Sequence, residues 1–273
     1  MNMNITFIGG GNMATAMIGG LLKNGWAAEA LFVVDVDEAA RERLARELHV
    51  RVAPQLDALS ATADCIVFAV KPQQVRETAG LLYRFLGSQL LLSIAAGIRL
   101  GDLSRWLGNY QKIVRVMPNT PALELAGVSA LCATPAVSAD DRARAEKIMR
   151  AVGTTLWVED EQQMDAVTAI SGSGPAYVFY FIEALQQAAI ELGFSAADAQ
   201  RLALATFAGA IKLARASPDD VATLRARVTS RGGTTERAIG MMEKDKLRDA
   251  IVRAIRAAAE RSRELGEELG RDC

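Results

Sequence analysis

A run of three glycines separates an apolar segment from a helix-like segment near the start of the chain, in the stretch NITFIGGGNMATAMIGGLL. The apolar residues 5–8 predict a strand, and residues 13–23 predict the helix that follows it. Gly9, Gly11 and Ala14 therefore occupy the G-x-G-x-x-A positions of a dinucleotide-binding turn. The first glycine permits the tight turn, the second lets the backbone approach a pyrophosphate, and the alanine permits close helix packing.

The backbone N–H groups at the start of this helix are expected to bind the pyrophosphate. Asn12 and Met13 lie at this point and are predicted to contact the cofactor together with the glycines. A glycine turn without a ligand is the alternative. A strand before the turn, a helix after it and an acidic residue downstream favour the cofactor site.

Strand-like and helix-like segments alternate through the first half of the chain. Further apolar strands are predicted at residues 31–34, 65–70, 90–94, 113–117 and 128–132, and a helix at 38–48. Continuous apolar strands with helical crossovers are typical of a parallel sheet that is buried on both faces. We therefore predict a Rossmann-like, doubly wound α/β domain over residues 1–160, with its ligand at the carboxyl ends of the strands.

The second predicted strand ends in VVDVD, which places Asp35 where an acidic side chain accepts hydrogen bonds from the adenosine ribose. By that rule Asp35 favours NAD over NADP, because a carboxylate repels a 2′-phosphate. Alternatively it caps the next helix, a role for which Asp37 also qualifies. Arg41 and Arg43 lie early in that helix and could weaken the discrimination, so NADPH and NADH both stay open as the cofactor.

Two proline-containing loops follow later strands of the same sheet, AVKPQ at residues 69–73 and VMPNTPA at residues 116–122. Because both leave the carboxyl edge, they are predicted to line the cofactor or substrate cleft. Stiff turns without a ligand are the alternative. The candidate residues are Ala69, Val70, Lys71 and Pro72 for the cofactor and Asn119 for the substrate, and Thr120 is expected to line the same cleft.

The second half, residues 161–273, is predicted to be helical. The stretch SGSGPAYVFYFIEALQQAAIELG has Pro175 in its first turn, and Ser195 begins the next helix as a cap. Residues 177–182 are apolar on every face, which is typical of a helix buried deep in a protein or between chains. We expect this domain to form a homodimer at least.

Bulk composition excludes several classes of function. The 273 residues carry a formal net charge of -1, so a nucleic-acid partner is not expected. No run approaches the roughly 20 apolar residues of a membrane span, and no signal peptide is recognised. Three scattered cysteines and a single histidine, His49, predict a cytoplasmic, reducing location, no metal site and catalysis without imidazole.

The stretch VTSRGGTTE, residues 228–236, places hydroxyl side chains beside two glycines just before a predicted helix. Consecutive N–H groups at a helix N-terminus bind anions, and neighbouring hydroxyls add donors. A carboxylate is therefore the expected ligand. A tight turn with a Ser/Thr cap is the alternative.

Five motifs occur in order along nearly the whole chain: IGGGNM, AVKPQ, RVMPNTPA, AISGSGPAYVF and VTSRGGTTERAI. The set resembles pyrroline-5-carboxylate reductase. The resemblance implies hydride transfer from NAD(P)H to the ring imine of pyrroline-5-carboxylate, which gives L-proline. It also implies a Rossmann domain and a helical dimerisation domain, with assembly as a dimer or as a decamer of dimers.

The resemblance further implies that the glycine-hydroxyl stretch holds the substrate carboxylate beside the Rossmann domain of a partner subunit. The implied contacts are made by Ser230, Gly233, Thr234 and Thr235. Thr235 is the candidate catalytic residue, because its hydroxyl could hydrogen-bond the ring nitrogen.

Two positions depart from the family pattern. Arg231 stands where the family usually has proline, which makes the loop less stiff and adds a charge that attracts a carboxylate. Many members also have a glutamate upstream, and Asp219 or Asp220 could substitute for it here.

Two other functions fit parts of the chain. A β-hydroxyacid dehydrogenase shares the plan but depends on a lysine in the helical domain, and the first lysine after SGSGPAY is Lys212, far along the next helix. A non-catalytic nicotinamide-binding protein would leave the glycine-hydroxyl stretch without a purpose.

Overall fold

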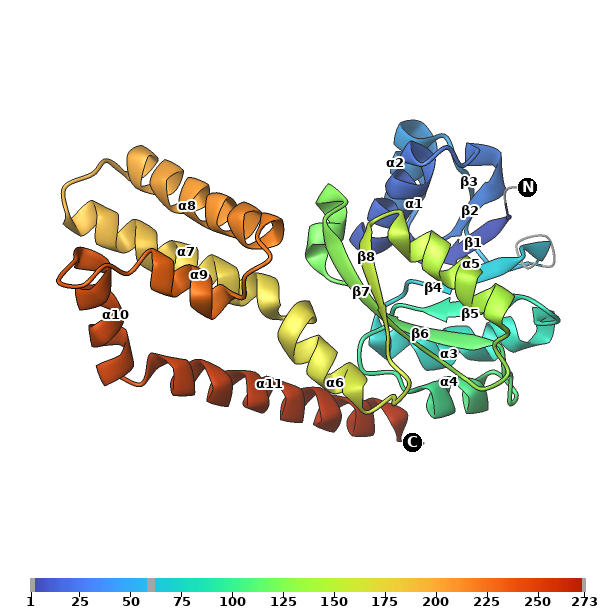
Figure 1. The fold of residues 1–273 in the computed structure, drawn as a ribbon. Coiled ribbons are helices and arrows are strands. Elements are labelled where there is room, and N and C mark those ends of the chain that lie inside the picture. Colours follow the sequence, from blue (N-terminus) through green and yellow to red (C-terminus); the bar gives the residue numbers. More distant parts are fainter. Residues whose placement is uncertain (1–2, 58–61, 272–273) are drawn as a thin grey trace. The chain divides into compact units, whose positions relative to one another are not determined.

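The computed structural model describes residues 3–57 and 62–271, and contacts divide the chain into two compact units (Figure 1). Unit 1 is Met1–Ser173 with Ala258–Cys273, and unit 2 is Gly174–Ala257. The expected domain boundary after residue 160 lies inside unit 1 and stays a prediction of domain organisation. The contacts themselves divide the chain at the helix that begins at Gly174.

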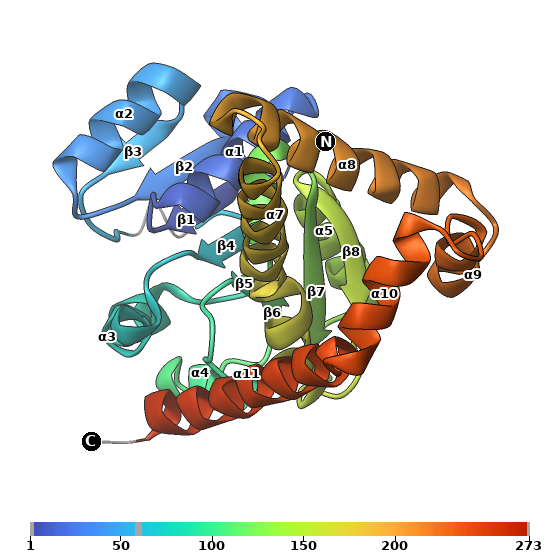
Figure 2. The ribbon, with the colours of Figure 1, turned by 90° about the vertical axis from the view of Figure 1, so that its left-hand side faces the viewer.

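Unit 1 is built on one sheet whose eight strands, among the described residues, run in the order β3-β2-β1-β4-β5-β6-β7-β8 (Figure 2). The strands are β1 (Ile5–Ile8), β2 (Leu31–Val34), β3 (Arg51–Ala53), β4 (Cys65–Phe68), β5 (Leu90–Ser93), β6 (Ile113–Met117), β7 (Gly127–Ala133) and β8 (Gly153–Trp157). The order reverses between β1 and β4, which is the switch point where ligands bind in doubly wound sheets. The predicted Rossmann-like fold is confirmed.

One pair of strands departs from the predicted parallel arrangement. β6 and β7 are antiparallel, with Met117 opposite Ala130, whereas the other pairs are parallel. A parallel connection needs a crossover of a dozen or more residues. Only the short 3-10 helix η4 (Thr120–Glu124) joins these two strands, so the chain turns back on itself.

Helices cover both faces of the sheet and close two apolar cores. Side chains such as Met17, Leu44 and Ile148 lie in the core on one face, and Val75, Leu103 and Met164 lie in the core on the other. The first face carries α1 (Asn12–Lys23), α2 (Glu38–Leu48) and α5 (Ala139–Arg150), and the second carries α3 (Pro72–Leu82), α4 (Leu100–Trp106) and α6 (Gln163–Val167). The cores hold the strand ends in place, and those ends position the site.

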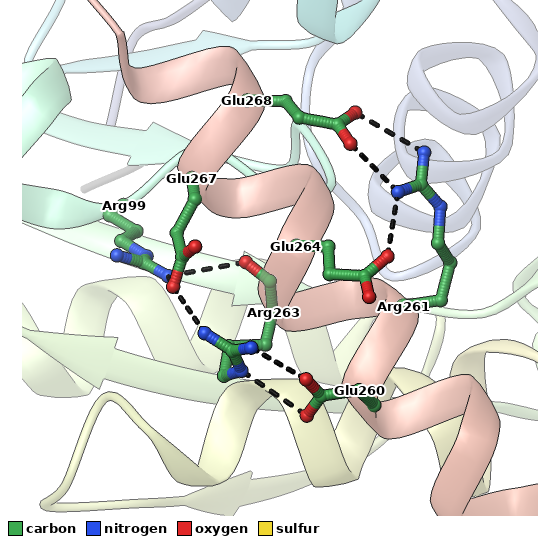
Figure 3. Close-up of polar contacts among 7 residues, drawn as sticks. All are labelled: Arg99, Glu260, Arg261, Arg263, Glu264, Glu267 and Glu268. Carbon is green, nitrogen blue, oxygen red and sulfur yellow. Dashed lines mark hydrogen bonds and ion pairs between the residues drawn. The ribbon is translucent and has the colours of Figure 1, made fainter.

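The end of the last helix, α11 (Leu247–Gly270), belongs to unit 1 and makes polar contacts with the rest of that unit. Ser262 Oγ donates to Asp165 Oδ1 at 2.7 Å. Arg99 donates to the carbonyl of Arg263 and lies 3.8 Å from the Glu267 carboxylate. Figure 3 shows the contacts of Arg99 with this helix, together with the pairs that Arg261 and Arg263 form with glutamates of the same helix. These pairs are exposed to solvent, which screens their charges, so they contribute little to stability.

Unit 2 consists of helices with little apolar core of its own. They are α7 (Gly174–Glu191), α8 (Ala196–Ala216), α9 (Val221–Arg227), α10 (Thr234–Lys244) and the first part of α11. Ser195 caps α8 by accepting from Asp198 N at 3.1 Å, as predicted. The buried apolar side chains of unit 2 among the described residues are Ile182, Ala199 and Ala203.

Large apolar side chains are exposed along the same helices. Phe179 and Tyr180 of α7 are 60% and 71% exposed, although the sequence predicts a helix buried within a protein or between chains. A single chain leaves this surface in contact with water, and exposed apolar patches of this kind mark protein interfaces.

Candidate functional site

The glycine turn, residues 9–11, joins β1 to α1 at the switch point of the sheet. Gly9 has a φ of 101°, and its N–H donates to Val34 O at 2.8 Å. A Cβ at this position would lie 2.6 Å from Ala69 O, so no larger residue fits between the ends of β2 and β4. The sharp turn is therefore determined by glycine and by the two strands beside it.

Gly11, unlike Gly9, has open space around it. It caps α1 without a side-chain hydrogen bond, the first turn of the helix contains no acidic residue, and nothing lies within 4 Å of where its Cβ would be. The N–H groups at the start of α1, near Asn12 and Met13, thus face open space at the positive end of a helix, which suits a pyrophosphate. Ala14 is buried in the core beneath, as the fingerprint predicts.

Asp35 follows β2, and backbone groups engage both of its carboxylate oxygens. Oδ2 accepts from Gly10 N at 2.5 Å, and Oδ1 accepts from Asp37 N at 2.8 Å. The helix cap is Asp37, whose Oδ1 accepts from Ala39 N at 3.1 Å. The capping alternative therefore applies to Asp37, while Asp35 connects the end of β2 to the glycine turn.

A cavity of about 670 Å³ opens over these groups. It is lined by residues 8–11, 34–37, 54–56 and 69–71, with further residues from α2 and α3. Ala69, Val70 and Lys71 line it, and their contact with a cofactor stays a prediction, whereas Pro72 lies outside the lining and begins α3, with Lys71 as the helix cap. The turn, the open helix end and a cavity of this size fit the dinucleotide that the sequence predicts.

Sequence reasoning missed the part of the cavity wall made by residues 54–56. These residues follow β3, a strand of three residues that are exposed or only partly buried and give no continuous apolar run. The only local signal for this strand was a short segment with two apolar residues that ends at Pro54. That signal does not predict that Val52 pairs with Val33 of β2.

Asn119 has both ends of its side-chain amide engaged within unit 1. Its Oδ1 accepts from Val128 N at 2.8 Å, and its Nδ2 donates to Ser171 O at 3.1 Å. Ser171 belongs to the π-helix η5 (Thr168–Gly172), and such turns occur frequently at functional sites. Asn119 thus joins the start of β7 to η5, and its predicted contact with substrate stays a prediction. Thr120 begins η4 and is exposed.

The hydroxyl loop, residues 228–236, lies in unit 2 and ends at α10. Gly232 has a φ of 74°, and its N–H donates to Glu236 Oε2 at 2.6 Å. Gly233 caps α10 without a side chain, and a Cβ there would lie 2.6 Å from the Oγ of Ser230. The loop is therefore shaped by its glycines and by one glutamate of the helix that it precedes.

The predicted substrate residues of unit 2 come together at this helix start. Thr234 and Thr235 are its first residues, and within the described residues neither hydroxyl hydrogen-bonds to another protein group. Because Gly233 provides no side-chain cap, the first N–H groups of α10 keep their capacity to bind an anion. Arg231 is exposed beside them. The arrangement suits a small carboxylate.

The two aspartates upstream of the loop have local partners. Asp219 pairs with Arg227 and accepts from Ser217 Oγ at 3.2 Å. Asp220 caps α9, and the hydrogen bond from Thr223 N lowers the pKa of its carboxyl. Their expected role in place of the family glutamate stays a prediction.

The other reactive side chains have structural surroundings. Cys65 and Cys132 are buried free thiols, and burial raises the pKa of both, so neither is a ready nucleophile. His49 is exposed at the end of α2. Within residues 3–57 and 62–271, no cluster of metal-ligating side chains is present, and none of the helices is long and apolar enough to cross a membrane.

Two family models match the chain. The model described as pyrroline-5-carboxylate reductase dimerisation matches residues 161–265. The model described as NADP oxidoreductase coenzyme F420-dependent matches residues 4–97, which contain the glycine turn and Asp35.

Similar proteins align over nearly the whole chain. The pyrroline-5-carboxylate reductase of Pseudomonas aeruginosa is 43% identical and aligns over 97% of this chain and 98% of its own length. A pyrroline-5-carboxylate reductase structure from Coxiella burnetii is 40% identical with a TM-score of 0.92, covering 97% of this chain and 99% of its own. The Plasmodium falciparum pyrroline carboxylate reductase, solved with NADP bound, is 31% identical with a TM-score of 0.86, covering 97% of this chain and 98% of its own.

Proposed function

The chain belongs to the pyrroline-5-carboxylate reductase family, and we propose that it reduces L-1-pyrroline-5-carboxylate to L-proline with NADPH or NADH. The observation that carries this function is the similarity over 97% of the chain to a reductase that is 43% identical. The two glycine-containing sites support it, because one suits a dinucleotide and the other suits a small carboxylate.

The reaction adds a hydride to the ring carbon of the C=N bond and a proton to the ring nitrogen. When bound, the reduced nicotinamide supplies the hydride. The glycine turn and the start of α1 would hold its pyrophosphate and Asp35 would bind its adenosine ribose, while Lys71 borders the cavity. The chain's own task is to hold donor and acceptor in a reactive geometry.

The substrate is held by the hydroxyl loop. The N–H groups at the start of α10, with Ser230, Gly233 and Thr234, bind the substrate carboxylate. Thr235 Oγ1 hydrogen-bonds the ring nitrogen, where the product carries its proton, and water or a nearby carboxylate completes the proton transfer. No imidazole is required, in agreement with the single exposed histidine of the chain.

The protein acts as a homo-oligomer. The match of residues 161–265 to a dimerisation model supports a dimer, and so do the exposed apolar side chains of unit 2. We further propose that the hydroxyl loop of one subunit works beside the Rossmann fold of its partner, in dimers that assemble into decamers in the cytoplasm.

The test is oxidation of NADPH and NADH with pyrroline-5-carboxylate, run side by side on the purified chain. Proline formation with either cofactor is expected. Oxidation of β-hydroxy acids without imine reduction would favour the dehydrogenase alternative. Cofactor binding without turnover of any cyclic imine would favour the non-catalytic one.

A further inference from the structure

The loop after β2 carries two carboxylates on one wall of the cofactor cavity. Asp35, Val36 and Asp37 all line that cavity. Val36, between the two aspartates, is 83% exposed. The segment that lies nearest the adenosine ribose in a fold of this type is therefore acidic and contains no cation.

Hydrogen bonds hold this loop in one conformation. Asp35 N donates to Ala53 O at 3.1 Å, which continues the pairing of β2 with β3. Arg41 Nη1 donates to the carbonyls of Asp35 and Val36 at 2.8 and 2.9 Å. The carboxylates of Asp35 and Asp37 also accept hydrogen bonds from backbone N–H groups. Moving the charges away from a ligand would break several of these bonds.

The cations near the loop face other groups. Arg41 is bonded to the two backbone carbonyls. Arg43 lines the cavity, but its guanidinium lies 3.4 Å from Gly10 O and 3.5 Å from Thr15 Oγ1, on the side of the glycine turn and α1. Its Nε is buried without a partner among the described residues. Arg43 therefore lies beside the glycine turn, where a fold of this type binds the pyrophosphate.

We propose that this chain discriminates against NADPH in favour of NADH, and that Asp35, Val36 and Asp37 determine the choice. The proposal rests on the reductase function above. A 2′-phosphate adds about 1.5–2 negative charges and would meet two carboxylates held by backbone bonds, while the neighbouring guanidinium groups of Arg41 and Arg43 lie against other protein groups. The 2′-hydroxyl of NADH instead donates to a carboxylate oxygen.

Binding measured without substrate tests the proposal directly. Titrations followed by the fluorescence of the reduced nicotinamide should give the wild-type chain an affinity for NADH at least about tenfold above that for NADPH. Val36→Arg combined with Asp37→Ser should reverse the order. The serine keeps an N-cap on α2 and removes one charge, while the arginine offers a phosphate partner.

Matched variants separate charge from shape. Val36→Gln introduces a side chain that is polar and extended, like arginine, but uncharged. The logarithm of the NADPH-to-NADH affinity ratio should therefore change by less than about a third of the change that arginine causes. Arg43→Gln should weaken both cofactors together if Arg43 faces the pyrophosphate. A loss confined to NADPH would place the 2′-phosphate at Arg43 and overturn the proposal.

The outcomes distinguish this proposal from the reductase function. A wild-type chain that binds NADPH as tightly as NADH, or more tightly, and reduces pyrroline-5-carboxylate would contradict the proposal and leave the function standing. A chain that binds NADH tightly but reduces no cyclic imine would contradict the function. The preference for NADH over NADPH would still be measured by the binding titrations.

Discussion

The glycine turn of unit 1 and the hydroxyl loop of unit 2 are both glycine-rich segments that lead into a helix N-terminus. The glycine turn lies between two buried strands, and a Cβ on Gly9 would meet the backbone of Ala69. The hydroxyl loop is partly or fully exposed, and nothing lies within 4 Å of where a Cβ on Gly232 would be. The same local chemistry therefore has a rigid support in one unit and only its own hydrogen bonds in the other.

This difference indicates how the two sites are completed. Unit 1 has a continuous core on each face of its sheet, so a single chain forms the cofactor cavity. Unit 2 buries few apolar side chains and exposes many. We therefore expect the hydroxyl loop, unlike the cofactor cavity, to need a second chain to exclude water from a bound substrate.

A charge on the apolar surface of α7 provides the strongest test of this contrast. Phe179→Asp should abolish the homo-oligomer, because an unpaired carboxylate is costly to bury. Reductase activity should then fall by about 100-fold or more, while NADH affinity stays within about threefold because unit 1 is intact. Sedimentation velocity, a steady-state reductase assay and cofactor titration measure the three quantities. Phe179→Leu is the control that should still associate, and a fully active single-chain Phe179→Asp variant would refute the contrast.

Substitutions at two neighbouring glycines test the support of the glycine turn. Gly9→Ala should lower the free energy of unfolding by about 2–5 kcal/mol, because the alanine would have to adopt the positive φ of the turn and its Cβ would clash with Ala69 O. Gly11→Ala should change stability by about 0.5 kcal/mol or less but weaken cofactor binding, because its methyl group points into the space for the pyrophosphate. Urea denaturation and cofactor titration provide the readouts. Equal stability losses in both variants would contradict the structural distinction.

Substitutions at Thr235 test the role of the hydroxyl loop in catalysis. Thr235→Ala should lower kcat/KM for pyrroline-5-carboxylate by about tenfold or more, equivalent to about 1.4 kcal/mol of transition-state stabilisation. Thr235→Ser keeps the hydroxyl and should stay within about threefold of the wild type. A loss below about twofold in the alanine variant would remove Thr235 from the mechanism.

The smallest effect concerns a polar anchor of unit 1. Burial alone raises the pKa of Asp141, but hydrogen bonds from Ser138 and Lys112, with the charges of Lys112 and Arg144, bring it below its usual value. A lowered pKa stabilises the fold above the unfolded value of about 3.9, and this contribution is lost as pH falls through the folded pKa. Asp141→Asn should cost about 1–2 kcal/mol at pH 7.

Urea denaturation at several pH values checks the sign of this effect. The difference between wild type and Asp141→Asn should be largest near neutrality and should shrink below about pH 4, where the wild-type carboxyl also becomes protonated. A difference that grows on acidification would contradict the assigned contacts.

Much of the fold could be predicted because its signals are local. The strands at residues 5–8, 31–34 and 113–117 end where the sequence predicts, since each is a short, mainly apolar run in which Thr6 and Arg115 are the polar residues. β3 was missed because its three residues are not fully buried. The direction of β7 was also missed, because it depends on the length of the connection from β6 and on the partner strand.

The sequence by itself determined the glycine turn, the helix caps at Asp37 and Ser195, and the hydroxyl loop, since each depends on what nearby residues allow the backbone to do. Only the tertiary structure decided that the carboxylate of Asp35 bonds to Gly10, 25 residues away, and that Asn119 joins Val128 to Ser171. A hydrogen bond between distant residues forms only where packed elements bring donor and acceptor within about 3 Å, and no local pattern specifies that distance.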